Sequence, residues 1–344
     1  LATNGLNGYQ ANSASDPDPF ISINLHKAWG YNKFGSGEKI AIFDSQFAIN
    51  CTNGNGAAYN HYDLLHLSYT IVSATGQVGT HYCASASGAH GDQVAAIAVG
   101  RDNNDSGAST VGIAPSATNL IIGDYNLKGS ETNHTDWWAD FFDSARTNGA
   151  TVTNMSFGSN TVDADDIQSY MTSNSASAST AYSYYLNDAS LTTTASSVDT
   201  WVTAMNNYQT AGGVIVQSLS NPTTIAATNT YSVDDADFFA AMPVFFSQLE
   251  EAWITAVNID KTGTSGNYTY TRKSGKCGQT AQYCLGADGW NITVISYANT
   301  NARGSTFTNS AGTSFVAPQI SGAVALLAEH FPNHSAEQLV DRLL

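Results

Sequence analysis

Gly312-Thr313-Ser314-Phe315-Val316-Ala317-Pro318, with the apolar run Gln319 to His330 behind it, decides the fold of this chain. Ser314 lies among small residues before an Ala-rich segment too long for a surface loop, so we expect it at the N-terminus of a buried helix. Unpaired backbone N–H groups and the positive end of the helix dipole stabilise an oxyanion there. Ser314 is therefore a candidate nucleophile; the alternative is a serine that caps a core helix.

A nucleophilic serine needs a neighbouring base. His90 stands at the start of a second Ala-rich segment, in Gly88-Ala-His-Gly-Asp92, and Gly91 allows the backbone to approach whatever the imidazole faces. Histidine is the natural general base near neutral pH. His90 is the candidate base; a structural helix histidine is the alternative.

The base in turn needs an acid that orients it. Lys39-Ile-Ala-Ile-Phe-Asp44 is a short continuous apolar run that ends in a carboxylate, which is typical of a buried strand in a parallel sheet. Ligands and chemistry collect at the carboxyl ends of such strands. Asp44 is therefore the candidate orienting acid, although an acid at this place can also cap a helix or a turn.

Gly-Thr-Ser-x-x-Ala-Pro around Ser314, His90-Gly91 and the strand ending at Asp44 occur in the order Asp, His, Ser. Together they resemble the motifs of the subtilisin-like serine proteases, the subtilases, over roughly residues 20 to 344. The resemblance implies an α/β fold with a mostly parallel central sheet, helices on both faces and loop insertions. It departs from the family pattern at Gln46 and Ala96, where glycine is common, and at Asp92, where threonine is common.

Two further segments resemble the substrate-binding elements of subtilases. Asn221 follows the apolar strand 212–220, and in that position the family has an asparagine that donates to the oxyanion; a turn residue before Pro222 is the alternative. Here Ser220 replaces the glycine usual before it. The segment Ser156-Phe157-Gly158 resembles the one whose backbone pairs with extended substrate.

Length and patterning predict one catalytic domain over residues 1–344. Residues 1–20 form an N-terminal arm, and residues 159–197 are a Ser/Thr-rich insertion that we expect as a long surface excursion near the cleft. Amphipathic helices are expected over 134–148 and 197–208, with their aromatic residues in the core.

The charge balance limits the partners. Charged residues make up 12% of the chain, and 28 acids against 12 bases give a net charge of -16, which argues against nucleic acid and anionic membranes. No apolar run reaches the 18 residues that suggest a membrane span. We expect a monomer that binds protein or peptide substrates. The opening residues lack basic and apolar signal regions, so any signal or pro-segment is expected to have been removed.

Four cysteines allow three pairings. We expect Cys51 with Cys83 and Cys277 with Cys284, because each pair falls within one local excursion of the chain; free buried thiols are the alternative. Two disulfides would imply an oxidising compartment. The Cys277 to Cys284 loop looks like one in subtilase passenger domains of bacterial autotransporters.

No cofactor is expected to be required. His61, His66 and His81 match no compact metal-ligand spacing and are interpreted as solvated loop residues, so no metal site is assigned to them. A calcium ion at the loop containing Asp102 and Asp105, with Asn103 between them, is possible, and a solvated turn is the alternative.

The sequence therefore predicts an extracellular or cell-surface serine endopeptidase that uses an Asp-His-Ser triad and an acyl-enzyme. A catalytically inactive surface or adhesion module on the same fold is one alternative, motivated by Asp92, Ala96 and Ser220. A sedolisin-type acid peptidase shares the Gly-Thr-Ser signature and fits the acidic composition, but the His90-Gly91 motif counts against it.

Overall fold

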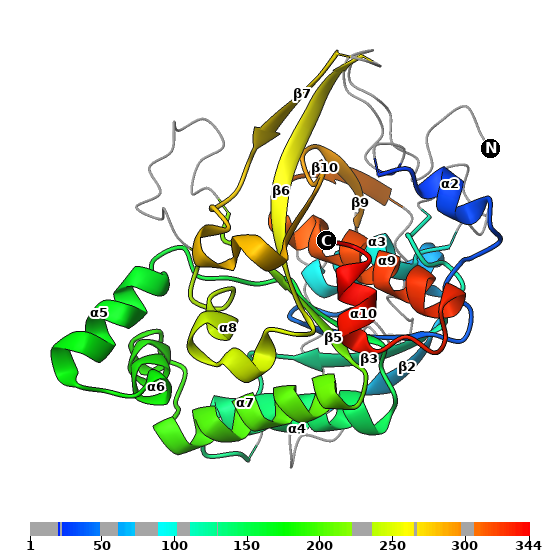
Figure 1. Ribbon diagram of the computed structural model, residues 1–344. Coiled ribbons are helices and arrows are strands. Elements are labelled where there is room, and N and C mark those ends of the chain that lie inside the picture. The colour runs from blue at the N-terminus through cyan, green and yellow to red at the C-terminus, as the bar shows by residue number, and fades with distance from the viewer. Residues whose placement is uncertain are drawn as a thin grey trace.

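A computed structural model describes Phe20 and residues 23–48, 61–72, 89–101, 111–128, 130–221, 236–264, 267–296 and 306–344. A central sheet runs through the molecule with helices packed on its faces (Figure 1). The strands are β1 (Lys39–Asp44), β2 (Ser68–Ile71), β3 (Asn119–Asp124), β4 (Val152–Met155), β5 (Val214–Ser218), β6 (Trp253–Thr264), β7 (Asn267–Arg272), β8 (Cys284–Ala287), β9 (Ile292–Ser296) and β10 (Thr306–Ser310).

The sheet has the order β2-β3-β1-β4-β5-β6 with all neighbours parallel. β8 also runs parallel to β6, whereas β7 is antiparallel to the outer half of β6. The predicted mostly parallel sheet is confirmed. β9 and β10 form a separate antiparallel pair that precedes the turn of Ser314.

Helices cover both faces of the sheet, as predicted. α3 and α9 lie on one face and contact β1, while α4 and α7 pack together on the other (Figure 1). The helices are α2 (Leu25–Trp29), α3 (His90–Val99), α4 (His134–Thr147), α5 (Ala164–Asn174), α6 (Ala178–Asp188), α7 (Ala195–Thr210), α8 (Met242–Phe245), α9 (Ala317–His330) and α10 (Ala336–Asp341).

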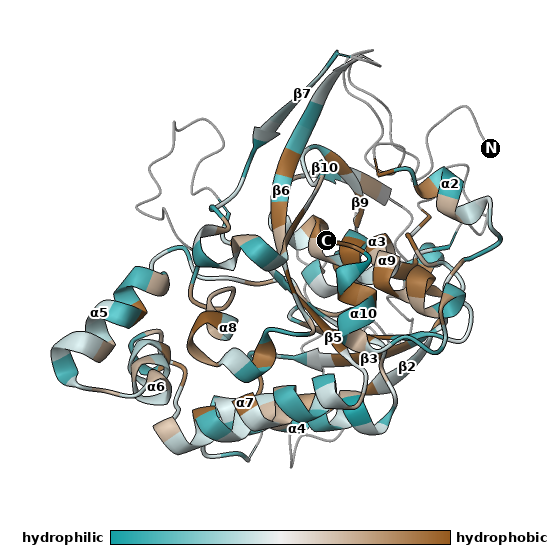
Figure 2. Cartoon of the chain, in the orientation of Figure 1, coloured by the Kyte–Doolittle hydropathy of each residue, from teal (hydrophilic) through white to brown (hydrophobic). Residues whose placement is uncertain are grey.

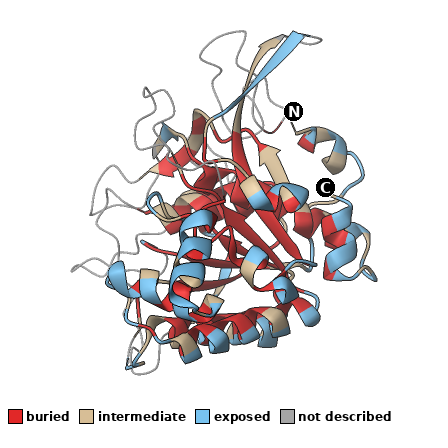
Figure 3. Ribbon diagram, turned by 60° about the vertical axis from the view of Figure 1, so that its left-hand side comes forward, coloured by how far each residue is buried: buried red, intermediate tan, exposed pale blue. Residues whose placement is uncertain are grey.

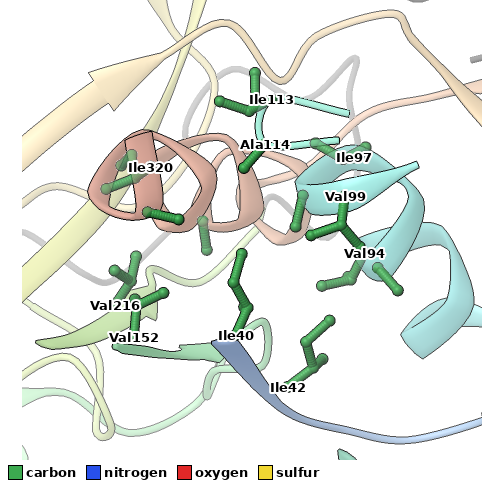
Figure 4. Close-up of a cluster of buried hydrophobic side chains, with 14 of the residues drawn as sticks. Ile40, Ile42, Val94, Ile97, Val99, Ile113, Ala114, Val152, Val216 and Ile320 are labelled. Atoms are coloured by element: carbon green, nitrogen blue, oxygen red, sulfur yellow. The ribbon is translucent and has the colours of Figure 1, made fainter. Parts of the chain in front are cut away.

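β1 supplies both halves of the core because successive strand residues point to opposite faces. Ile40 and Ile42 belong to the cluster under α3 and α9, and Ala41 and Phe43 belong to the one under α4 and α7. Figure 4 shows the first cluster, with the strand side chains directed at α9 and α3. Burying each large apolar side chain stabilises the fold by about 1.5–3 kcal/mol. The central strands are accordingly buried along their length (Figure 3).

The insertion at 159–197 is helical rather than an irregular excursion. Asp163 caps α5 through a capping box and Ser177 caps α6. α6 buries Tyr182 and Leu186 in the core. α5, in contrast, consists mostly of hydrophilic residues (Figure 2). The many Ser, Thr and Asn residues obscure the helical spacing of the apolar residues in this segment. The capping residues Asp163 and Ser177, however, could have been recognised in the sequence.

The expectations for the cysteines and histidines have mixed outcomes. Cys277 and Cys284 form the predicted disulfide. Cys51, Cys83 and His81 lie outside the described residues. His61 is not solvated: it is fully buried, and its Nδ1 accepts the N–H of Asp63, so it caps the start of the short 3-10 turn Tyr62–Leu64.

Candidate active site

Asp44 and His90 meet at the carboxyl end of the central strand. Asp44 ends β1 and is 1% exposed, and His90 opens α3. Their Oδ1 and Nδ1 atoms lie 2.7 Å apart. Because the carboxylate can only accept, Nδ1 carries the proton, and Nε2 is left as the basic nitrogen. This pair was predicted from the sequence, and the structure brings it together.

The pKa of His90 is raised above its ordinary value. Burial of the ring disfavours the imidazolium and lowers the pKa, but the charge of Asp44 and its hydrogen bond outweigh that effect. The carboxylate therefore makes the imidazole a stronger base and stabilises the imidazolium that forms when it takes a proton. The side chain of His90 is still 29% exposed, so a substrate can reach it.

A second carboxylate beside this pair was missed. Asp124 ends β3 and stands directly opposite Asp44 in the parallel register. Burial raises the pKa of Asp124, the N–H of Asn126 opposes this, and the charge of Asp44 adds to the rise. The signal was available, because two apolar strands of the chain both end in aspartate and neighbouring parallel strands end at one edge.

Ser314 lies in a tight turn in front of α9 rather than in the helix itself. Thr313–Phe315 form a 3-10 turn, and α9 begins at Ala317. The ring of Phe315 lies 6.0 Å from that of His90, and α3 contacts the turn. Among the described residues the Ser314 hydroxyl has no direct hydrogen bond to His90; it donates to the carbonyl oxygen of Ser156 at 3.1 Å.

Ser156 and Ser314 bind each other reciprocally, since the Ser156 hydroxyl donates to the carbonyl oxygen of Ser314 at 3.0 Å. Asn154 stabilises this pair, because its Nδ2 donates to Ser156 Oγ at 2.8 Å. Its Oδ1 accepts from Ser321 Oγ of α9 at 3.1 Å. Asn154 and Ser321 are fully buried and were not predicted. An amide in the fully buried strand β4 was the signal, because buried amides need partners.

Asn221 lies beside the turn Thr313–Phe315 that carries Ser314, as the resemblance implied. Its Oδ1 accepts the Thr313 N–H at 2.9 Å and the Thr313 hydroxyl at 3.1 Å. A main-chain N–H can only donate, so these bonds fix which end of the amide is oxygen. A Cβ placed on Gly312 would lie 3.3 Å from both Nδ2 and Oδ1 of Asn221, so the amide group lies beside the turn that carries Ser314.

The segment Ser156-Phe157-Gly158 continues from β4 along the site. Ser156 is buried, Phe157 is half-buried, and Gly158 is exposed. The carbonyl oxygen of Phe157 points inward and accepts from the side chains of Gln217 and Ser218. Gly158 is therefore the part of this segment whose backbone is open to an extended peptide.

Two of the departures from the family pattern, Gln46 and Asp92, have local structural explanations. Gln46 has φ of 60°, in the left-handed region that glycine adopts at the least cost. Asp92 is buried and its Oδ2 accepts the N–H of Ala48 at 3.1 Å, so it fastens the segment after β1 to α3. A side chain at Gly91 would meet the ring of Phe47 at 2.6 Å. None of these departures displaces Asp44 or His90.

The subtilase family model matches residues 35–344, which is nearly the whole chain. The chain belongs to the subtilase family. This subtilase is 32% identical over 126 residues to the serotype-specific antigen 1 of Mannheimia haemolytica, across 36% of the chain and 13% of that protein. It is 27% identical over 127 residues to an extracellular serine protease of Serratia marcescens, across 32% of the chain and 12% of that protein. The matches thus span only a small part of both relatives.

Solved structures show the same fold. Sphericase superposes with a TM-score of 0.57 at 18% identity, covering 90% of this subtilase and 82% of sphericase. The MycP3 protease from the type VII (ESX-3) secretion system gives 0.56 at 20% identity, covering 99% and 84%. The prenylagaramide maturation protease PagA gives 0.58 at 16% identity, covering 92% and 85%. The predicted subtilisin-like architecture is confirmed.

The structure bears on the expected metal site and membrane span only through the residues that it describes. Asp102, Asn103 and Asp105 lie outside the described residues, so the calcium prediction is untested there. Across the residues that the structure does describe, no three metal-binding side chains gather, and no helix is long and apolar enough to cross a bilayer.

Proposed function

We propose that this subtilase is a serine endopeptidase that hydrolyses protein or peptide substrates through an acyl-enzyme. The observation that carries the proposal is the 2.7 Å contact between Asp44 and His90, with the imidazole next to the turn that presents Ser314. Asp44 orients the ring, His90 Nε2 serves as the base, and Ser314 Oγ is the nucleophile. No cofactor takes part in this chemistry.

The reaction follows from these positions. Ser314 Oγ turns from Ser156 towards His90, gives its proton to Nε2 and bonds to the scissile carbonyl carbon. The oxyanion accepts from Asn221 Nδ2 and the Ser314 N–H. The C–N bond then breaks as the amine takes the proton from His90. Water then attacks the ester carbonyl carbon and gives a proton to His90, after which the bond to Ser314 Oγ breaks and Ser314 Oγ takes that proton back.

Recognition of the substrate is assigned to main chain. An extended peptide pairs with the exposed backbone of Gly158, and the carbonyl oxygen of Ser156 becomes available when Ser314 turns away. We also propose secretion to the cell exterior or surface as a monomer. The Cys277–Cys284 disulfide and the extracellular serine protease among the relatives support export.

A catalytically inactive surface module is the second candidate. The specific observation in its favour is that the Ser314 hydroxyl donates to Ser156 and not to His90. In such a module the reciprocal serine pair is a structural clamp, and the His90 ring never receives the Ser314 proton.

Fluorophosphonate labelling followed by peptide mapping separates the two candidates. We expect one adduct, on Ser314, and loss of both the adduct and casein hydrolysis in Ser314→Ala. Ser310→Ala, four residues upstream, is the matched control and should keep both. An unlabelled, correctly disulfide-bonded protein over pH 5 to 10 would refute the peptidase and leave the inactive module.

A further inference from the structure

Asp237 is a carboxylate with no exposed surface, close behind the candidate active site. Its Oδ1 accepts the N–H groups of Phe239 at 3.1 Å and Ala240 at 3.3 Å. These bonds stabilise the turn that leads into α8, but they use only one of the two carboxylate oxygens. Isolated buried carboxylates are costly, so the role of the second oxygen needs an explanation.

The second oxygen faces the two segments that flank the site. A Cβ placed on Gly158 would lie 3.0 Å from Asp237 Oδ2 and 3.4 Å from the N atom of Ser220. Gly158 is the open end of the proposed peptide-binding segment, and Ser220 directly precedes Asn221. Gly158 therefore lies against both the Asp237 carboxylate and the backbone of Ser220, which leads into the proposed oxyanion donor.

Asp237 is itself held firmly by the helical insertion. Its backbone forms a bridge with Asp163, the cap of α5. On either side of it, Phe238 donates its N–H to Val162 at 3.0 Å and Ala236 accepts from Ala164 at 3.0 Å. These backbone contacts therefore fix the position of the Asp237 carboxylate relative to the insertion.

The electrostatics agree with this placement. Burial raises the pKa of Asp237 to about 7, and the N–H groups of Ala240, Phe239, Ser220 and Ser159 oppose the rise. Two of these four amides belong to the segments that flank the site. Tyr182 is the titratable neighbour, and burial together with the charge of Asp237 raises its pKa. The N–H groups of Ser220 and Ser159 thus act on the carboxylate electrostatically, although Oδ2 makes no hydrogen bond of ordinary length within the described residues.

We infer that Asp237 is a positioning residue of the peptidase reaction: it fixes Ser220, and through it Asn221, relative to Gly158, and so sets the gap that the scissile carbonyl enters. The inference rests on the proposed function. It assigns no contact between Asp237 and substrate. Its effect is on the placement of the Asn221 amide, and displacements of about 1 Å at such a donor cost up to about 100-fold in rate.

Asp237→Asn is the sharpest perturbation. The amide oxygen keeps the bonds from Phe239 and Ala240, so the turn is retained, while Nδ2 replaces the oxygen that faces Ser220 and sets donor against donor. With a fluorophosphonate probe and concentrations corrected for labelled serine, we expect kinact to fall about 10- to 100-fold, with KI changed less than about threefold. Asp163→Asn, which still caps α5, should change neither constant.

A double-mutant cycle with Asn221→Ala tests the route of the effect. If Asp237 acts through Asn221, Asp237→Asn lowers kinact less than about twofold in the Asn221→Ala background, whereas an unrelated structural defect lowers it equally in both. If Asp237→Asn does not fold, Gly158→Ala presses on the same oxygen and enters the same cycle. Equal losses in both backgrounds, or unchanged kinact in Asp237→Asn, overturn the inference while wild-type labelling upholds the peptidase. An unlabelled wild type instead overturns the peptidase and this inference with it.

Discussion

Asn154→Ala removes one buried side chain that joins β4, α9 and the serine pair. Asn154 donates to Ser156 Oγ at 2.8 Å and accepts from Ser321 Oγ at 3.1 Å. Losing a typical hydrogen bond costs about 1 kcal/mol, and a buried hydroxyl left without an acceptor costs about 1–3 kcal/mol. Ser156 keeps its acceptor, the carbonyl oxygen of Ser314, so only Ser321 is left unpaired. We expect the free energy of unfolding to fall by about 3 kcal/mol.

The measurement is urea unfolding in the Ser314→Ala background, where unfolded chains are not digested. The fluorescence of the buried tryptophans reports it. Ser321→Ala completes a cycle, because it removes the partner that Asn154→Ala leaves unpaired; the two changes should couple by about 1–2 kcal/mol. A loss below about 1 kcal/mol, or strictly additive losses, would refute the idea that this network supports the site.

Four further outcomes are expected. Asp44→Asn should lower kcat about 10,000-fold and move the acid limb of kcat/KM to lower pH, since the charge that raises the pKa of His90 is gone; an unmoved limb contradicts this. Replacing Cys277 and Cys284 together by serine should cost about 2.5 kcal/mol of unfolding free energy, as for a short closed loop, and equal urea midpoints contradict it. Gly322→Ala places a Cβ 2.4 Å from Ile113 Cβ, so overpacking should lower Tm at a cost of about 1–3 kcal/mol, and an unchanged Tm contradicts it. Because folding raises the pKa of Asp237 from 3.8 to about 7, the folded state holds an extra proton between those values; stability should therefore fall as pH rises from 4 to 7, and Asp237→Asn should flatten this slope in urea titrations.

Much of the sheet could be predicted because its strands are short apolar runs with clear ends. The bounds of β1 coincide with the expected segment, and the helix expected at 134–148 is α4. What could not be predicted depends on tertiary context. α5 and α6 carry weak apolar faces, and α6 is stabilised by burying Tyr182 against Phe238. β10 pairs with β9, and no local sequence pattern predicted this strand.

The site shows the same division. Asp44, His90 and Ser314 were predicted because each opens or closes an element with a recognisable motif, but their roles stay proposals until labelling is done. Asn154 and Asp237 were missed, since their importance lies in contacts with residues far away in the sequence. A motif fixes which groups react, whereas the supports behind them depend on how distant segments pack.

The position of α9 has a consequence for how the molecule is made. This helix covers the face of the sheet built by Ile40, Val152 and Val216, yet it is among the last elements of the described chain to leave the ribosome (Figure 4). Until then that apolar face has no cover, and contacts of such long sequence separation form slowly. The turn that carries Ser314 directly precedes α9. The proposed peptidase activity therefore requires that the sheet is covered first, because Ser314 is synthesised just before the helix that covers it.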